Sequence, residues 1–240
     1  MIKAVFFDLY NTLGRFDPPR EEMQAQAIER LGLVADKAAV VRAYPIADDF
    51  MAQENQRLPL RNRSPEERDR FFTQYQRLLL RHAGLDVPDE TALQLFQSVR
   101  ALRQGFVLFD DALPTLAALK AKRYVLGLLS NLDEDVDDIT RDLGLSPYLD
   151  FALSSRQVGV PKPHPRFFEQ ALGLAKMTPE VVVHVGDQYR NDVQGARGVG
   201  IHPVLLDREG HNPAPHDCPR ISTLTEVIGL VEEMNRAEST

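Results

Sequence analysis

Acidic, hydroxyl and amide side chains recur directly after short apolar runs in this sequence, where they could support nucleophilic chemistry. Asp8 follows the first run, close to the start of the chain. Ser130 and Asn131 follow a second run. Asp187 follows a third, and Asp192 lies close behind it. A nucleophilic carboxylate, hydrogen-bond donors and further carboxylates are the groups used in two-step displacement through a covalent aspartyl intermediate.

These groups would meet if the apolar runs are parallel strands. The runs are continuous and end in small polar residues, as buried parallel strands do, and helical patterns separate them. This alternation predicts right-handed βαβ units and a doubly wound α/β sheet, in which polar groups gather beyond the carboxyl ends of the strands. We expect strands near residues 5–7, 124–129, 151–153, 181–185 and 201–206, and helices near 112–122, 133–143, 165–174, 190–198 and 223–236.

The segment between the first two runs has a different pattern. Apolar residues recur there at helical spacing, and Ser64-Pro65-Glu66-Glu67 is typical of a helix start. We expect helices after Pro18 and near residues 36–57, 64–83 and 89–104, with no strand among them. The sequence therefore predicts a helical domain of residues 16–105, inserted into an α/β core domain of residues 1–15 and 106–240.

The composition of the chain limits the partners and the cellular compartment that we expect for this protein. The formal net charge of -7 is unfavourable for a protein whose main partner is nucleic acid. The apolar run before Asp8 is too short for a signal peptide or a membrane span. A single cysteine, Cys218, excludes an internal disulfide. We expect a cytoplasmic protein with no nucleic-acid or membrane partner; the sequence does not predict its oligomeric state.

Four segments carry a family resemblance. They are Asp8-Leu9-Tyr10-Asn11-Thr12-Leu13, Leu128-Leu129-Ser130-Asn131, Lys162-Pro163-His164-Pro165 and Gly186-Asp187-Gln188-Tyr189-Arg190-Asn191-Asp192. In order and spacing they resemble the four motifs of the haloacid dehalogenase superfamily of hydrolases. The helical insertion between the first two segments is similar to the mobile type 1 cap of that superfamily. The resemblance implies a Rossmann-like core with a helical cap.

The resemblance also implies roles for the polar residues. Asp8 would be the nucleophile, and Lys162 would neutralise it and its covalent intermediate. Thr12 and Ser130 would bind phosphoryl or carboxylate oxygens of the substrate, with Asn131 beside them as part of the same catalytic set.

A magnesium site is implied by the same motifs. Asp8, Asp187 and the backbone carbonyl of Tyr10 would bind Mg²⁺, and Asp192 would lie in or just behind the metal's ligands. Independently of the resemblance, three carboxylates beside one lysine repel one another, and a divalent cation would relieve that repulsion.

Tyr10 departs from the pattern of the superfamily's phosphatases. Those enzymes usually carry an Asp at this position that protonates the leaving alkoxide and then activates water, and a positioned acid/base is typically worth about 10²- to 10⁴-fold in rate. The superfamily's dehalogenases carry Tyr here and work without metal, but they generally replace the first Asp of the fourth motif. This sequence keeps both Asp187 and Asp192, and we weigh that pair above Tyr10.

The favoured hypothesis is therefore a Mg²⁺-dependent phosphatase of a small phosphorylated metabolite, acting through an aspartyl-phosphate. A metal-independent 2-haloacid dehalogenase is the first alternative. A protein that binds a phosphorylated ligand without turnover is the second. His184 is expected in the core, and His211, His216 and Cys218 in a surface loop, since their spacing matches no zinc site closely.

Overall fold

The computed structural model describes residues 1–102, 105–132 and 136–237. They form two compact units. One consists of Met1–Gly14 together with Leu108–Thr240, and the other is Arg15–Val107. No helix within the described ranges is both long and apolar enough to cross a bilayer.

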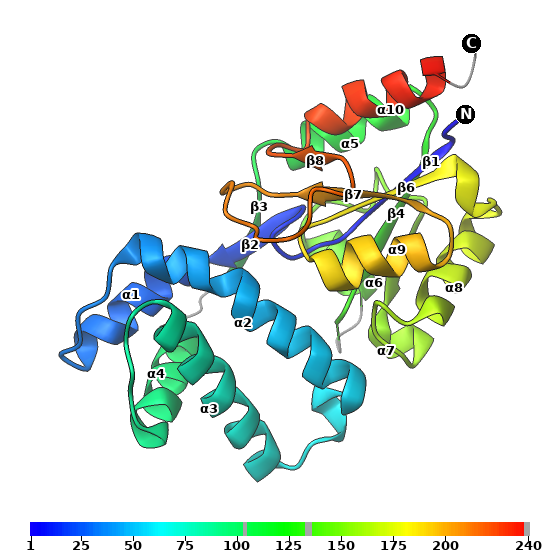
Figure 1. The fold of residues 1–240 in the computed structure, drawn as a ribbon. Helices are drawn as coiled ribbons and strands as arrows, with labels where there is room; N and C mark the ends of the chain where they lie inside the picture. Colours follow the sequence, from blue (N-terminus) through cyan, green and yellow to red (C-terminus); the bar gives the residue numbers. More distant parts are fainter. Residues whose placement is uncertain (103–104, 133–135, 238–240) are drawn as a thin grey trace. The chain divides into compact units, whose positions relative to one another are not determined.

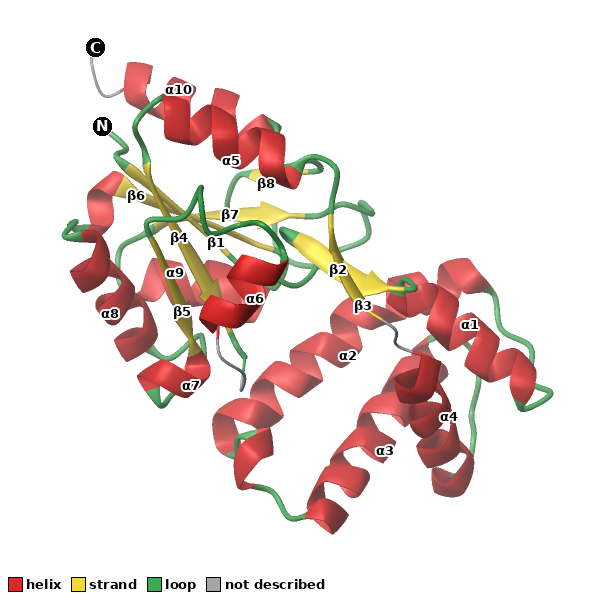
Figure 2. Ribbon diagram, turned by 180° about the vertical axis from the view of Figure 1, so that it is seen from behind, coloured by secondary structure: helices red, strands yellow, loops and turns green. Residues whose placement is uncertain are grey.

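A six-stranded sheet forms the centre of the first unit (Figures 1 and 2). In spatial order its strands are β5 (Phe151–Ser154), β4 (Val125–Ser130), β1 (Ala4–Phe7), β6 (Val182–Gly186), β7 (His202–Leu206) and β8 (Arg220–Ile221). All neighbouring pairs are parallel. The first strand therefore lies in the middle of the sheet, with β4 and β6 on either side. The predicted doubly wound α/β core is confirmed.

Helices cover both faces of this sheet (Figure 1). They are α5 (Ala112–Ala121), α6 (Val136–Asp142), α7 (Ser155–Val158), α8 (Pro165–Ala175), α9 (Gly195–Gly198) and α10 (Glu226–Ala237). On one face α8 buries Phe167 and Phe168 in a cluster with Phe6 of β1. Phe151 packs edge-on against Phe6, at 5.3 Å between ring centroids, over Gly127. A β-carbon at Gly127 would come within 2.3 Å of the Phe151 ring, which explains the glycine inside a buried strand.

Four α-helices and a short 3₁₀ turn make up most of the second unit. They are α1 (Arg20–Arg30), α2 (Lys37–Arg57), the turn η1 (Leu60–Asn62), α3 (Pro65–His82) and α4 (Asp89–Leu102). Ser64 caps α3 in the predicted way: its hydroxyl accepts from the backbone of Glu67, whose side chain accepts from the backbone of Ser64. The helices share a core that includes Ile28, Tyr44, Leu79 and Leu95.

The structure corrects several expected elements. Two strands, β2 (Gly14–Asp17) and β3 (Gly105–Leu108), pair at the ends of the insertion, where no strand was expected. Each has four residues, too few to show a clear period of two. The expected helix at 190–198 forms, but its first part is a π-helical turn, η3 (Tyr189–Gln194), which continues directly into α9. Residues 103–104 and 133–135 of two other expected helices lie outside the described residues.

Candidate active site and metal centre

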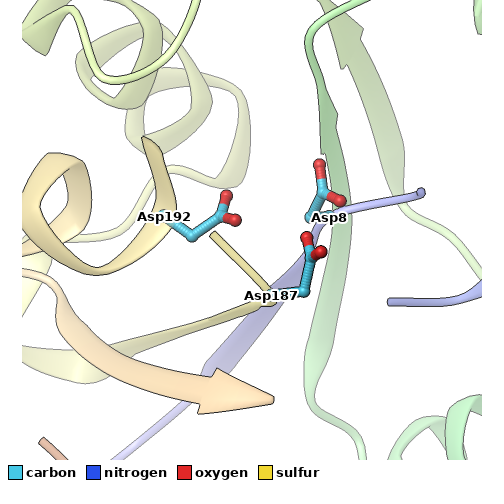
Figure 3. Close-up of side chains that lie close together, drawn as sticks. All are labelled: Asp8, Asp187 and Asp192. Carbon is cyan, nitrogen blue, oxygen red and sulfur yellow. The ribbon is translucent and has the colours of Figure 1, made fainter. Parts of the chain in front are cut away.

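Three carboxylates meet at the carboxyl edge of the sheet. Asp8 directly follows β1 and Asp187 directly follows β6, and these two strands are neighbours. Asp192 lies on η3, the turn that comes next in the chain. One oxygen of each carboxylate lies within 4.8 Å of the other two, and the three side chains lie close together (Figure 3). Parallel topology brings Asp8 and Asp187 to the same edge, as the sequence predicts for strand ends.

Gly186 makes room for this arrangement. A β-carbon at this position would lie 2.2 Å from the carboxyl carbon of Asp192. The Asp192 side chain therefore folds back over the end of β6, where its Oδ2 accepts a hydrogen bond from the backbone N–H of Gln188 at 3.0 Å. The order Gly-Asp-Gln at the end of the strand thus fixes Asp192 from two sides.

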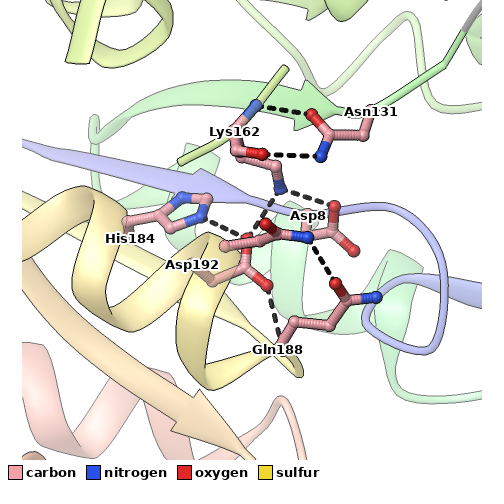
Figure 4. A network of polar contacts seen from close by, with 7 residues as sticks. Asp8, Asn131, Lys162, His184, Gln188 and Asp192 are labelled. Atoms are coloured by element: carbon pink, nitrogen blue, oxygen red, sulfur yellow. Dashed lines mark hydrogen bonds and ion pairs between the residues drawn. The ribbon is translucent and has the colours of Figure 1, made fainter. Parts of the chain in front are cut away.

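Lys162 ties two of the carboxylates together (Figure 4). It comes from the loop before α8, and only 2% of its surface is exposed. Its Nζ lies 2.7 Å from Oδ1 of Asp8 and 2.6 Å from Oδ1 of Asp192. Such short, charge-assisted contacts in a buried place are strong and directional. The lysine therefore sits where negative charge on Asp8 must be balanced.

Asn131 holds the main chain of Lys162. Its Oδ1 accepts from the Lys162 N–H at 2.7 Å, and its Nδ2 donates to the Lys162 carbonyl at 3.0 Å. Both polar atoms of the amide are thus engaged with one residue. Ser130 precedes Asn131 in the sequence. It is the last residue of β4, and it is buried.

Burial and charge set the ionisation of this cluster. Burial raises the pKa of Asp8 to about 6, although Lys162 opposes the shift. Burial alone would lower the pKa of Lys162, but Asp192 and Asp8 outweigh it and raise that pKa. For Asp192 burial is likewise outweighed, and Lys162 and His184 hold its pKa well below the usual range. Near neutral pH Lys162 is therefore charged and Asp192 ionised, whereas a proton competes for Asp8.

The first-motif loop brings three further residues. Asn11 adopts φ 58°, a left-handed conformation that Asn tolerates, and its Nδ2 lies 3.3 Å from Oδ2 of Asp187. Thr12 is fully buried, and its hydroxyl makes no hydrogen bond with any described residue. Tyr10 is half-buried and forms an isolated bridge with Gly14. The roles predicted for Thr12 and for the Tyr10 carbonyl stay predictions.

Two residues that contact these groups were not expected from the sequence to do so. His184, expected only in the core, is fully buried and its Nε2 lies 3.0 Å from Oδ1 of Asp192. Asn212, from the loop after β7, donates to the backbone carbonyl of Asp187 at 3.1 Å. Both are ordinary residues in the sequence, because a strand histidine and a loop asparagine carry no signal of a distant partner.

The loop after β7 is also fastened to the fourth motif by Asp217. Its Oδ2 accepts from the Tyr189 hydroxyl and from Arg197, each at 2.7 Å. These contacts hold the pKa of Asp217 at about 2. His211 and His216 of this loop are exposed, as expected for a surface loop.

The carboxylate cluster fits a hard divalent cation. The three side chains of the cluster all offer carboxylate oxygens, the donor type that Mg²⁺ prefers. Lys162 contacts Asp8 and Asp192 and brings one positive charge to three acidic side chains. A cation among these oxygens would offset the remaining repulsion.

Comparison with known proteins identifies the family. A family model described as haloacid dehalogenase-like hydrolase matches residues 2–200. The chain belongs to this family. The resemblance inferred from the four motifs is thereby confirmed, and the matched residues include all four of them.

Individual relatives cover this haloacid dehalogenase-like chain to different extents. It is 36% identical over 159 residues to haloacid dehalogenase-like hydrolase domain-containing protein 3 of Mus musculus, which covers 61% of this chain and 63% of that protein. The match thus spans less than two thirds of the mouse protein's length. Identity to ribulose-1,5-bisphosphate 5-phosphatase of Halopiger xanaduensis is 29% over 228 residues, covering 93% and 92% of the two chains.

A solved structure extends the comparison to the whole fold. The 2-haloacid dehalogenase from Pseudomonas syringae pv. tomato is 26% identical and superposes with a TM-score of 0.57, covering 98% of this chain and 100% of that one. Relatives described as a phosphatase and as a dehalogenase thus both resemble this chain.

Proposed function

We propose that this protein is a Mg²⁺-dependent phosphohydrolase that acts on a small phosphorylated molecule through an aspartyl-phosphate on Asp8. One observation carries the proposal: oxygens of Asp8, Asp187 and Asp192 lie within 4.8 Å of one another. A dehalogenation site that works without metal has no need for two further carboxylates beside its nucleophile. Keeping them there without a cation would cost free energy through repulsion.

The chain's own residues have distinct tasks in this mechanism. Asp8 attacks phosphorus, so a bond forms between its carboxylate oxygen and phosphorus while the bond to the leaving oxygen breaks. Lys162, held by Asp192, balances negative charge on Asp8 and on the transferred group. Bound among the three carboxylates, Mg²⁺ would supply charge neutralisation for the phosphoryl group. Water then attacks phosphorus, which releases phosphate and restores Asp8.

Tyr10 favours substrates with a good leaving group. It stands between Asp8 and Thr12 and carries no carboxyl group that could protonate an alkoxide. Acyl and aryl phosphates need little protonation as they leave, so the site should turn them over faster than alkyl phosphates. A small acyl or aryl phosphate is therefore the substrate class that we propose.

A metal-independent 2-haloacid dehalogenase is the second candidate. Tyr10 favours it, since a halide leaves without a proton, and so does the likeness to the Pseudomonas syringae dehalogenase. On that hypothesis Asp187 would be dispensable.

The proposed phosphohydrolase would act in the cytoplasm, without a nucleic-acid or membrane partner. These parts of the proposal rest on the composition of the chain.

The deciding experiment compares substrates and metal. Acetyl phosphate and p-nitrophenyl phosphate are offered to the wild type with Mg²⁺ and with chelator, and Asp8→Asn is the control. The proposal expects turnover with Mg²⁺ only, and none from Asp8→Asn. Halide release from 2-chloropropionate in chelator, with no phosphate release under either condition, would favour the second candidate.

A further inference from the structure

His184 is a polar residue in a strand whose residues are all buried. It lies on β6 between Val183 and Val185, and its ring is fully buried. Phe168 of α8 packs edge-on against it at 5.4 Å between ring centroids. An aliphatic side chain would suit these surroundings, because burying a polar ring costs free energy unless it is hydrogen-bonded. The buried imidazole therefore needs a hydrogen-bond partner.

That partner is Asp192. Nε2 of His184 lies 3.0 Å from Oδ1 of Asp192 (Figure 4). An ionised carboxylate only accepts hydrogen bonds, so Nε2 carries the hydrogen and the imidazole donates. The imidazole thus gives Oδ1 of Asp192 a directed hydrogen bond from within the sheet.

The contact has a consequence for both oxygens of Asp192. Oδ1 accepts from His184 and from Lys162, which uses the roughly two acceptor positions of a carboxylate oxygen. Oδ2 accepts from the backbone of Gln188 and keeps one position. Three donors, from the loop before α8, from β6 and from the residue that precedes η3, thus hold the carboxylate. Without His184, Oδ1 would be held by Lys162 alone.

We propose that His184 is a positioning residue, whose Nε2–H holds Oδ1 of Asp192 so that the remaining acceptor position of Oδ2 is available to a metal ion shared with Asp8 and Asp187. The metal part of this inference rests on the proposed function. The positioning part does not, because it concerns the geometry of Asp192 and Lys162 in the metal-free protein.

Metal binding provides the first test. Mn²⁺, which can replace Mg²⁺ and is seen by electron paramagnetic resonance when free, is titrated into the wild type and three variants. His184→Gln keeps an N–H at a similar reach, whereas His184→Leu removes it and His184→Asn holds its amide short of Asp192. Residues that orient metal ligands typically contribute about 10- to 100-fold to affinity. We expect His184→Leu and His184→Asn to lose Mn²⁺ affinity by this factor, and His184→Gln to keep nearly the wild-type affinity.

A matched control comes from the neighbouring strand. His202 on β7 also uses Nε2, for a contact of 3.0 Å with the carbonyl of Glu180, and it pairs in register with Val183. His202→Leu should leave Mn²⁺ affinity unchanged. Thermal unfolding of every variant identifies any that does not fold. If His184→Leu fails to fold, the Mn²⁺ affinities of His184→Gln and His184→Asn are compared instead, because both variants bury an amide.

Crystal structures of the metal-free variants separate this inference from the proposed function. If the wild type binds neither Mn²⁺ nor Mg²⁺, the proposed function loses its metal, but His184 is still tested. In the structures of His184→Asn and His184→Leu, the Asp192 carboxylate should rotate and Lys162 Nζ should shift. In the structure of His184→Gln, neither group should move. Unchanged positions of both groups in all variants, or wild-type Mn²⁺ affinity in folded Leu and Asn variants, would overturn the assignment.

Discussion

Asn131 binds the backbone of Lys162 at both of its polar groups, with contacts of 2.7 and 3.0 Å. The amide therefore sets the position from which the lysine side chain reaches Asp8. Loss of both hydrogen bonds in Asn131→Ala should cost about 1 kcal/mol each. Since Lys162 acts on the nucleophile, we expect kcat for p-nitrophenyl phosphate to fall on the order of 10- to 30-fold, with KM little changed.

A double-mutant cycle checks the route of this effect. If Asn131 acts through Lys162, Asn131→Ala should add little in a Lys162→Ala background, because coupled residues are not additive. A rise in KM at constant kcat would instead show that Asn131 contacts the substrate directly. Full additivity of the two substitutions would equally contradict the positioning role.

Gly186→Ala should disturb Asp192. The added methyl group would meet the Asp192 carboxyl carbon at 2.2 Å, so one of the two must move. Overpacking of this kind typically costs about 1–3 kcal/mol of stability. Gly173→Ala in α8 is the matched control, since its methyl group meets nothing within 4 Å and should stabilise the helix slightly. Urea unfolding measures both, and equal stabilities would refute the steric argument.

The stability of the metal-free protein should depend on pH through Asp8. Its pKa rises from 3.8 to about 6 on folding, so folding favours the protonated form. This contribution is complete below pH 4 and is lost as pH rises through 6. Between pH 4 and 7.5 the wild type should therefore lose up to roughly 3 kcal/mol relative to Asp8→Asn, at about 1.4 kcal/mol per pKa unit.

Denaturant unfolding in chelator measures this difference at each pH. Only its change with pH matters, because effects of Asp8→Asn that do not involve the ionisation of Asp8 are the same at every pH. A difference that does not change with pH, or one that favours the wild type as pH rises, would mean that Asp8 is ionised without cost in the folded chain.

Asp187→Asn separates the two candidate functions. For the phosphohydrolase it removes a metal ligand, and turnover with Mg²⁺ should fall more than about 100-fold, since residues that only orient ligands can contribute that much. For a metal-independent dehalogenase, halide release should persist in this variant. Phosphate and halide release are measured on the same preparations, and undiminished Mg²⁺-dependent phosphate release would contradict the assigned ligand.

The sequence predicts the parts of the site that depend on strand order. Asp8, Ser130 and Asp187 each end or follow a parallel strand, so topology alone brings them to one edge. The apolar runs and the Ser64 cap are local signals, and the corresponding elements form as expected. The family motifs add Lys162, whose loop position has no periodic signal of its own.

Contacts between distant residues could not be predicted in this way. His184 in a strand looks like any buried residue until Asp192 folds back over Gly186 toward it. Asn212 reaches the Asp187 carbonyl from a proline-rich loop whose path depends on the whole sheet. Strands β2 and β3 are too short for their pattern to be distinguished from a loop.

The fate of an oxygen atom tests the central claim most directly. In a single turnover with excess protein, in water enriched in oxygen-18, water should attack phosphorus of the aspartyl-phosphate. The heavy oxygen then appears in inorganic phosphate, and the peptide that contains Asp8 stays unlabelled by mass spectrometry. An alkyl ester on Asp8 would be attacked at its carbonyl carbon. Oxygen-18 in the Asp8 carboxylate, or no label in phosphate, would therefore contradict the proposed phosphohydrolase.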